Sequence, residues 1–215
     1  MPSAMIGPLS LRHAAANGDP IAQFEVASRF AEAKGVPQDF AQAATWYQRA
    51  AAQGIANAQY RLGALYERGL GVAADPARAR VWYGRAAEQG NVRAMHNLAV
   101  FSAGRPGSTT DYPSAVQWFT EAANRGLADS QYNLGILYES GRGVPASLAE
   151  AYKWYSLAAR SGDKDAIRRR DALREKLEPT SVNAVDTLII KWRAQPLDPA
   201  ANAPRGAVPG AQAAR

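Results

Sequence analysis

The sequence contains no cysteine and only two histidines, His13 and His96. The missing thiols exclude disulfides, thiolate metal sites and cysteine nucleophiles. Two histidines provide no ligand set for a histidine-based metal site, so we predict no metal and no cofactor. Neither a G-x-S-x-G turn nor a glycine-rich phosphate loop occurs. We therefore predict that the protein is not an enzyme and has no catalytic residues, although carboxylate pairs remain open because sequence spacing does not fix distance.

Long apolar segments are absent as well, and no run approaches the length that crosses a bilayer. The opening "MPSAMIGPLS" has neither a basic nor an apolar signal-peptide region, so we predict no signal peptide. Lysine is scarce, since only five of the 25 basic residues are lysines. The net charge of +6 and the pI of about 9.7 leave acidic partners open, but they equally fit a codon bias toward arginine.

One motif is abundant in this sequence. "WYQRAAAQG" begins at Trp46 and returns as "WYGRAAEQG" at Trp82, "WFTEAANRG" at Trp118 and "WYSLAARSG" at Trp154, always 36 residues apart. A fainter copy, "LRHAAANG", ends at Gly18. The wall of an active site has no reason to recur at a fixed interval, whereas a stacked structural unit does.

Each repeat reads as two helices. Within residues 41–76, the first segment places small and aromatic residues on one helical stripe, and the second segment does the same with leucine and tyrosine. Asp39 is positioned as the cap of the first helix, and Gly54 suits the left-handed position that ends it. Small residues recur in mid-helix at the 36-residue spacing, namely Ala27, Gly63, Ala99 and Gly135. Small side chains let helix axes approach closely, so the sequence predicts an all-α solenoid of helical hairpins.

The spacing A-x-x-W-Y-x-x-A-A-x-x-G-x-x-x-A-x-x-x-L-G-x-x-Y-x-x-G-x-G-V resembles the Sel1-like repeat, a relative of the tetratricopeptide repeat. This resemblance covers residues 8–162. It implies a right-handed superhelix of helical hairpins that binds other proteins or cell-wall components, usually without catalysis.

A narrower likeness concerns several segments, including "QYRLGALYERGLGV", "DSQYNLGILYESGRGV" and "VDTLIIKWRAQPLDPAANAP". They resemble the C-terminal periplasmic region of PodJ-type polar-organelle development proteins. The likeness implies a periplasmic module of a longer membrane-anchored protein that organises cell polarity or the cell envelope and contacts peptidoglycan or a partner protein. The alternatives are a cytoplasmic adaptor that binds an extended peptide and, more remotely, a cell-wall hydrolase.

Four parts of the chain are predicted. Residues 1–7 form an N-terminal leader, 8–162 the repeats, 163–194 two capping helices and 195–215 a disordered tail rich in proline and alanine. We expect Thr180 or Ser181 to cap the second of these helices and Leu188 to lie on its apolar side. The "RRR" at 168–170 fits either a phosphate or acidic-polymer contact or a solvated helix face.

Candidate binding residues follow from the resemblance, because first helices line the concave face in related repeats. The candidate groove consists of Gln42, Arg49, Arg78, Arg85, Gln117, Glu121, Asn97 and Asn133. The two asparagines offer amide contacts, and the alternative is that they bridge neighbouring backbones. The groove residues vary between repeats, as a specific ligand requires, but a merely solvated face would vary too. His96 occupies the position of Phe24, Tyr60 and Tyr132, which indicates a core aromatic.

The third repeat departs from the others at residues 102–111. A candidate contact loop there consists of Arg105, Ser108, Thr109 and Thr110. A loop that has simply drifted is the equal alternative. We predict no nucleic-acid partner, because the aromatic residues occupy core positions and do not alternate with the basic ones. The oligomeric state is left open.

Overall fold

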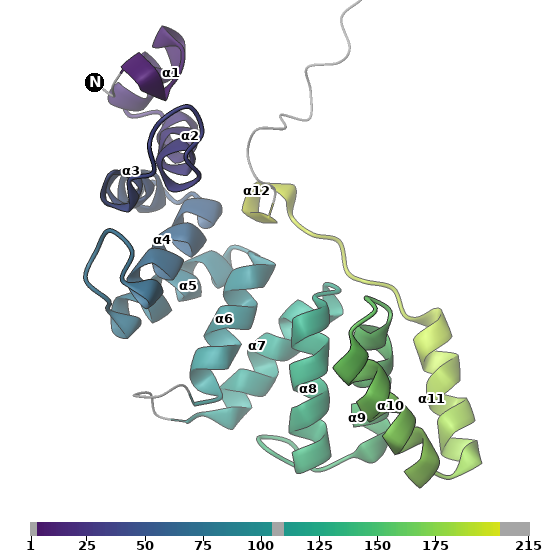
Figure 1. The fold of residues 1–215 in the computed structure, drawn as a ribbon. Coiled ribbons are helices and arrows are strands. Elements are labelled where there is room, and N and C mark those ends of the chain that lie inside the picture. The colour runs from purple at the N-terminus through teal and green to yellow at the C-terminus, as the bar shows by residue number, and fades with distance from the viewer. Residues whose placement is uncertain (1–3, 105–109, 203–215) are drawn as a thin grey trace, which may run out of the picture. The chain divides into compact units, whose positions relative to one another are not determined.

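The computed structural model describes residues 4–104 and 110–202. Throughout this described part the regular structure is helical, with twelve α-helices, one 3-10 turn and no strand (Figure 1). The chain divides into two compact units. Unit 1 comprises Met1–Asn91 and Asp198–Arg215, and unit 2 comprises Val92–Leu197.

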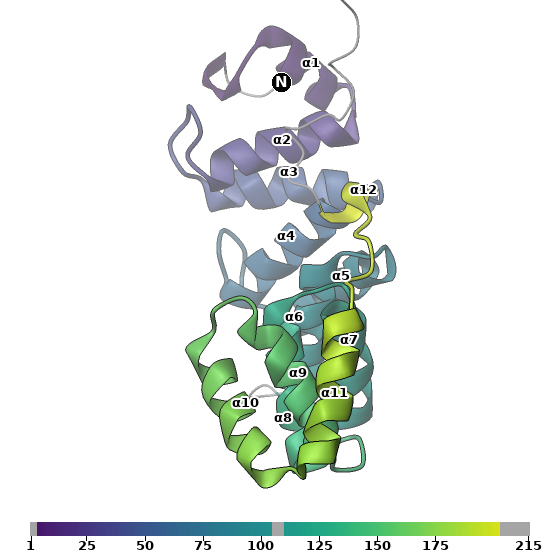
Figure 2. The same cartoon turned by 90° about the vertical axis from the view of Figure 1, so that its right-hand side faces the viewer.

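Unit 1 is a succession of antiparallel helices, and Figure 2 shows α1 to α4 following one another as layers. Its elements are η1 (Ala4–Ile6), α1 (Leu9–Ala16), α2 (Pro20–Ala31), α3 (Phe40–Ala52), α4 (Ala56–Arg68), α5 (Pro76–Glu88) and α12 (Pro199–Asn202). The helix pairs α2–α3 and α4–α5 form its most extensive packing interfaces.

Unit 2 repeats this arrangement and ends in two further helices. Its elements are α6 (Val92–Ser102), α7 (Tyr112–Asn124), α8 (Ala128–Ser140), α9 (Leu148–Ala159), α10 (Lys164–Lys176) and α11 (Pro179–Lys191). Both α10 and α11 pack against α9. The all-α solenoid predicted from the 36-residue period is confirmed.

The first helices α3, α5, α7 and α9 each begin at a side-chain cap, whereas α1 begins after Pro8 without one. A side-chain oxygen accepts a hydrogen bond from a backbone N–H three residues later at Asp39, Asp75, Asp111 and Ser147. These bonds satisfy donors that a helix start leaves without partners. The prediction for α11 is wrong, because the helix begins at Pro179 and Glu178 is its N-cap, without a side-chain cap bond. Proline at the first helical position starts this helix before Thr180 and Ser181.

The small residues in mid-helix mark where helices approach most closely. A Cβ atom at Gly63 would lie 2.8 Å from Cδ1 of Tyr83, and one at Gly135 would lie 2.6 Å from Cε1 of Tyr155. Only glycine fits at such distances, so the tyrosine ring of the next helix occupies the space of the missing side chain. The predicted close packing is confirmed.

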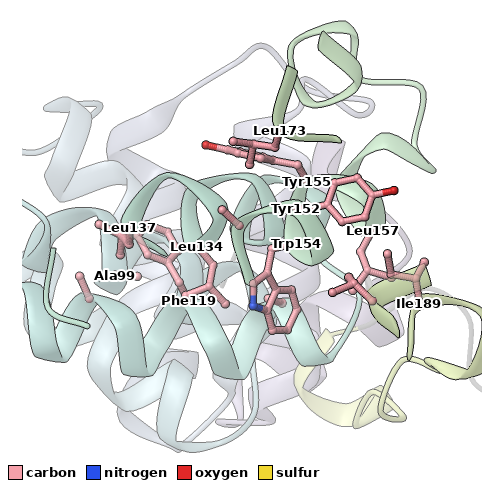
Figure 3. Packing of buried hydrophobic residues seen from close by; sticks show 14 of the residues in the cluster. Ala99, Phe119, Leu134, Leu137, Tyr152, Trp154, Tyr155, Leu157, Leu173 and Ile189 are labelled. Atoms are coloured by element: carbon pink, nitrogen blue, oxygen red, sulfur yellow. The ribbon is translucent and has the colours of Figure 1, made fainter. Parts of the chain in front are cut away.

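The core of unit 2 gathers around α9 (Figure 3). The side chains of Tyr155 and Tyr152 extend from opposite sides of this helix. Tyr155 extends toward α8 and α10, and Tyr152 extends toward α11. Leu173 of α10 and Ile189 of α11 are 2% and 9% exposed, so both helices bury apolar side chains against the repeats. The expectation for Leu188 is wrong, because that side chain is 56% exposed.

Both ends of the described chain are more ordered than the sequence suggests. Ile6, in the predicted leader, is fully buried, and its carbonyl accepts a hydrogen bond from Arg29. The tail predicted to be disordered from residue 195 has a defined course as far as Asn202. In unit 2 the amide of Gln195 donates to the carbonyl of Asn124, at 2.8 Å.

Candidate functional site

Two arginines of the candidate groove lie on tryptophan rings of their own helices. The guanidinium of Arg49 is 4.4 Å from the ring centroid of Trp46 on α3. That of Arg85 is 4.7 Å from the ring centroid of Trp82 on α5. Residues three apart are neighbours on a helix surface, so the helical spacing brings each arginine onto its ring. The corresponding positions on α7 and α9 carry Glu121 and Leu157. Each ring holds an exposed positive charge in a defined position by a cation–π contact.

The other two groove candidates of unit 1 lie at helix starts. Gln42 is exposed, and its backbone N–H donates to Asp39. Arg78 pairs with Asp75 at 3.2 Å and donates to the hydroxyl of Tyr66 at 3.4 Å. The structure therefore places exposed polar groups along both α3 and α5, and it fixes those of Arg78 through neighbouring side chains.

The remaining groove candidates lie on helices of unit 2. Gln117 is exposed on α7, where Glu121 forms an ion pair with Arg125. Asn97 lies on α6 and Asn133 on α8, where the Asn133 amide donates to a carbonyl of its own helix. Gln117 and Glu121 thus belong to a first helix, whereas the two asparagines belong to second helices. The groove as a whole stays a prediction.

The candidate contact loop falls largely outside the described residues. Arg105, Ser108 and Thr109 belong to the stretch that the structure does not describe, and Thr110 is exposed. The flanks keep the geometry of the other repeats, because the amide of Asp111 donates to the carbonyl of Ser102 as that of Asp75 donates to Tyr66. Its proposed contact role stays a prediction.

His96 lies among aromatic rings, as its position in the repeat indicates. Its ring meets that of Phe119 edge-on, with centroids 5.6 Å apart, and Nδ1 is 2.8 Å from the hydroxyl of Ser130. Burial lowers the pKa of His96 below its usual range, and Asp129 opposes this shift. A neutral imidazole with these neighbours is a core side chain.

A polar cluster joins α8, α9 and α10. The hydroxyl of Tyr155 donates to Glu139 at 2.8 Å, and Arg169 donates to the same carboxylate at 2.9 Å. Arg169 also donates to the hydroxyl of Tyr132 at 3.1 Å. Burial and the hydrogen bond to Glu139 raise the pKa of Tyr155. These hydrogen bonds join residues of three helices, so the cluster connects α8, α9 and α10.

The arginine run of α10 is matched by carboxylates. Arg168 pairs with Asp165 at 2.7 Å, Arg169 with Glu139 at 2.9 Å and Arg170 with Asp171 at 2.7 Å. Each positive charge thus has a negative neighbour inside the chain. This pairing favours the solvated-face interpretation of "RRR" over a phosphate contact.

Sequence reasoning missed a repeated glutamine. At equivalent positions of α2, α4 and α8 a buried glutamine amide donates to the carbonyl of a residue near the end of the preceding helix, namely Gln23 to Ala15, Gln59 to Ala51 and Gln131 to Ala123. The signal was available, because these glutamines recur at the 36-residue period with Met95 in the third place.

Nothing among residues 4–104 and 110–202 assembles into a candidate metal centre of three or more histidine or carboxylate ligands. In the same described part, no helix combines the length and the apolar character that a bilayer span requires.

The fold is an α-solenoid built from helix pairs. The Sel1 repeat family model matches residues 20–55, 56–91, 92–127 and 128–163. The chain therefore belongs to the Sel1 repeat family. Proteins of this family act as protein-interaction scaffolds and are typically not catalytic.

A solved structure supports this assignment. A Sel1 repeat protein from Oxalobacter formigenes is 31% identical, with a TM-score of 0.67 over 73% of this chain and 66% of that protein. This chain thus spans slightly less than two thirds of that relative. The protective antigen c5321 of uropathogenic Escherichia coli, which displays an SLR fold, is 22% identical over 86% of this chain and 56% of that one. Its TM-score is 0.44. No curated protein matches the chain, and the PodJ-type likeness stays a prediction.

Proposed function

We propose that this chain is a non-catalytic scaffold that binds an extended segment of a partner protein along the exposed flank of α3 and α5. One observation supports the proposal above the others, the stacking of Arg49 on Trp46 and of Arg85 on Trp82. Arginine and tryptophan dominate the energetics of protein interfaces. A guanidinium held on a ring loses less side-chain entropy on binding than a mobile one.

The chemistry of this flank indicates the kind of segment that fits. Two fixed positive charges favour a segment with carboxylates. Val81, which is 53% exposed on the same flank of α5, adds an apolar contact. The proposed ligand is therefore an extended acidic segment with at least one apolar side chain.

Affinity capture from a native lysate tests this function. We expect the parent chain to retain a partner that the variant Arg49→Ala/Arg85→Ala loses at least tenfold. Arg80→Ala provides the matched control, because Arg80 is an exposed arginine of α5 that lies outside the candidate groove. Equal capture by all three proteins would contradict the role of the stacked arginines.

A periplasmic setting, with contact to peptidoglycan or a polarity partner, is the second proposal. It rests on the PodJ-like segments and on the net charge of +6, which favours an anionic wall polymer. Sedimentation with purified sacculi at physiological salt separates it from a cytoplasmic adaptor, which would stay in the supernatant. Release of soluble muropeptides in the same assay would instead indicate a hydrolase.

A further inference from the structure

The short helix α12 belongs to unit 1 although it follows α11 in the sequence. It packs on α4, as Figure 2 shows, and Ala201 is only 2% exposed. Asp198 starts this helical turn by accepting a hydrogen bond from the amide of Ala200, at 2.8 Å. A segment rich in proline and alanine is thus held in one conformation by a defined surface.

Amide side chains on both sides hold this segment. Nδ2 of Asn91 donates to the carbonyl of Ala201, and it also lies 3.0 Å from Oδ1 of Asn57. In return, Nδ2 of Asn202 donates to the carbonyl of Gly90 at 2.9 Å. Unit 1 therefore binds both a backbone carbonyl and a side-chain amide of the segment.

The residues that receive the segment include the helix-start position of the repeat. Positions 19, 55, 127 and 163, which correspond to Asn91, carry Asp19, Ile55, Leu127 and Asp163, so this position is polar in three of its five copies. Asn91 is 3% exposed and Asn57 is 7% exposed, and burying amides costs free energy unless hydrogen bonds compensate. The bond from Nδ2 of Asn91 to the carbonyl of Ala201 is one of the hydrogen bonds that compensate this burial.

The equivalent turn one repeat earlier has no such occupant. A Cβ added at Gly54 would meet no atom within 4 Å, whereas one added at Gly90 would reach Cβ of Asp198 at 4.0 Å. The two glycines have nearly the same backbone conformation, with φ of 88° and 87°. At the next turn, a Cβ added at Gly126 would lie 3.2 Å from Cβ of Ala194, so the chain after α11 also covers a turn that is followed by Leu127. The bond of Asn91 to Ala201 distinguishes the turn at Gly90 from the other two.

We propose that the surface formed by Asn57, Asn91 and the Gly90 carbonyl is a peptide-binding site for a short alanine-containing helical turn, and that residues 198–202 occupy it in cis as a displaceable ligand. The contact is small, since it is made by a helix of four residues that buries Ala201, so the free segment binds weakly. Tethering gives the segment an effective concentration in the millimolar range, which keeps the site occupied. The site is separate from the flank of α3 and α5 and does not depend on the function proposed for it.

A competition experiment on the full chain tests this site. Ala201→Asp places a charge at a buried contact and should expel the segment while leaving the repeats folded, which far-UV circular dichroism checks. We then measure binding of a labelled peptide with the sequence of residues 195–202, "QPLDPAAN", by fluorescence anisotropy. A site that is occupied in nine of ten parent molecules binds the peptide about tenfold more weakly than an open site. We therefore expect at least tenfold tighter binding to Ala201→Asp than to the parent.

Two further variants locate the site. Adding Asn91→Ile, the residue found at position 55, should abolish peptide binding to Ala201→Asp. A peptide with Asn202→Ala should bind to Ala201→Asp at least fivefold more weakly than the unchanged peptide. This comparison needs no further change in the protein. Three outcomes would overturn the proposal. They are equal peptide affinity for the parent and Ala201→Asp, no measurable binding to either protein, and binding that neither Asn change weakens. Sedimentation of the parent as a monomer supports occupancy in cis, and a dimer that Ala201→Asp dissociates would overturn it in favour of a second copy.

Discussion

The helix pairs of this chain differ in the residues that meet at their closest approach. The pairs α4–α5 and α8–α9 each combine two tyrosine rings, a glycine and a glutamate, namely Tyr60, Tyr83, Gly63 and Glu67, and Tyr132, Tyr155, Gly135 and Glu139. The pairs α2–α3 and α6–α7 carry alanine at the positions of the glycine and the glutamate. We call the first kind tyrosine–glutamate pairs and the second kind alanine pairs.

The comparison shows that residues at one interface depend on each other. In the tyrosine–glutamate pairs the phenol donates to a carboxylate, as Tyr155 does to Glu139 at 2.8 Å. In the alanine pair α6–α7, Phe119 has no hydroxyl to satisfy and Ala103 supplies no acceptor. In α2–α3 the hydroxyl of Tyr47 lies 3.1 Å from that of Ser28 instead. The tyrosine hydroxyl at this position thus has a partner in each of the three pairs that contain one.

The largest expected effect comes from filling the space of a glycine in a tyrosine–glutamate pair. Gly135→Leu should lower the free energy of unfolding by about 3 kcal/mol, because the new side chain meets the ring of Tyr155 in a packed core. Gly84→Leu is the matched control, since a Cβ at Gly84 has no atom within 4 Å and the change favours the helix. Urea unfolding measures both. Equal losses at Gly135 and Gly84 would mean that the close approach does not hold the pair together.

A smaller effect is expected from removing one buried hydroxyl. Tyr83→Phe should lower the free energy of unfolding by about 1.5 kcal/mol, because Glu67 loses a charge-assisted hydrogen bond. The variant makes α4–α5 resemble α6–α7 at this position while leaving the carboxylate behind. Thermal and urea unfolding check the value. An unchanged midpoint would show that the hydrogen bond from the phenol to the carboxylate does not contribute to stability.

The smallest effect is expected from pH in the alanine pair α6–α7. Burial lowers the pKa of His96, so the folded chain binds fewer protons than the unfolded chain once the pH falls below about 6.5. The contribution of His96 therefore destabilises the fold as the pH decreases through this value. His96→Phe, which copies Phe24, should lessen the fall in melting temperature between pH 7 and pH 5. Identical pH profiles for the variant and the parent would contradict the buried neutral imidazole.

Local patterns made much of the fold predictable. The period of 36 residues, the caps at Asp39 and Asp75 and the small residues at Gly63 and Gly135 follow from the sequence, because each depends on neighbours within one or two helices. The sequence predicts a buried Leu188, but the side chain is exposed. The helical stripe gives the direction of a side chain but not the extent of the surface that covers it.

The polar contacts between helices could not be predicted in the same way. Tyr155 and Glu139 are 16 residues apart, and only the packing of α8 on α9 brings them together. Asn91 and Ala201 are separated by 110 residues, and composition alone predicts disorder for the segment that contains Ala201. The candidate groove is an intermediate case, since helical spacing predicts the stacking of Arg49 on Trp46 but not the identity of a ligand.

A double-mutant cycle at the alanine pair α6–α7 tests the mutual dependence of interface residues most directly. Phe119→Tyr alone adds a hydroxyl that faces Ala103, and Ala103→Glu alone adds a carboxylate that faces Phe119. We predict that each single change lowers the free energy of unfolding by about 1 to 2 kcal/mol, and that the double variant is at least about 1 kcal/mol more stable than the sum of the two losses predicts. Losses that simply add in the double variant would contradict the account.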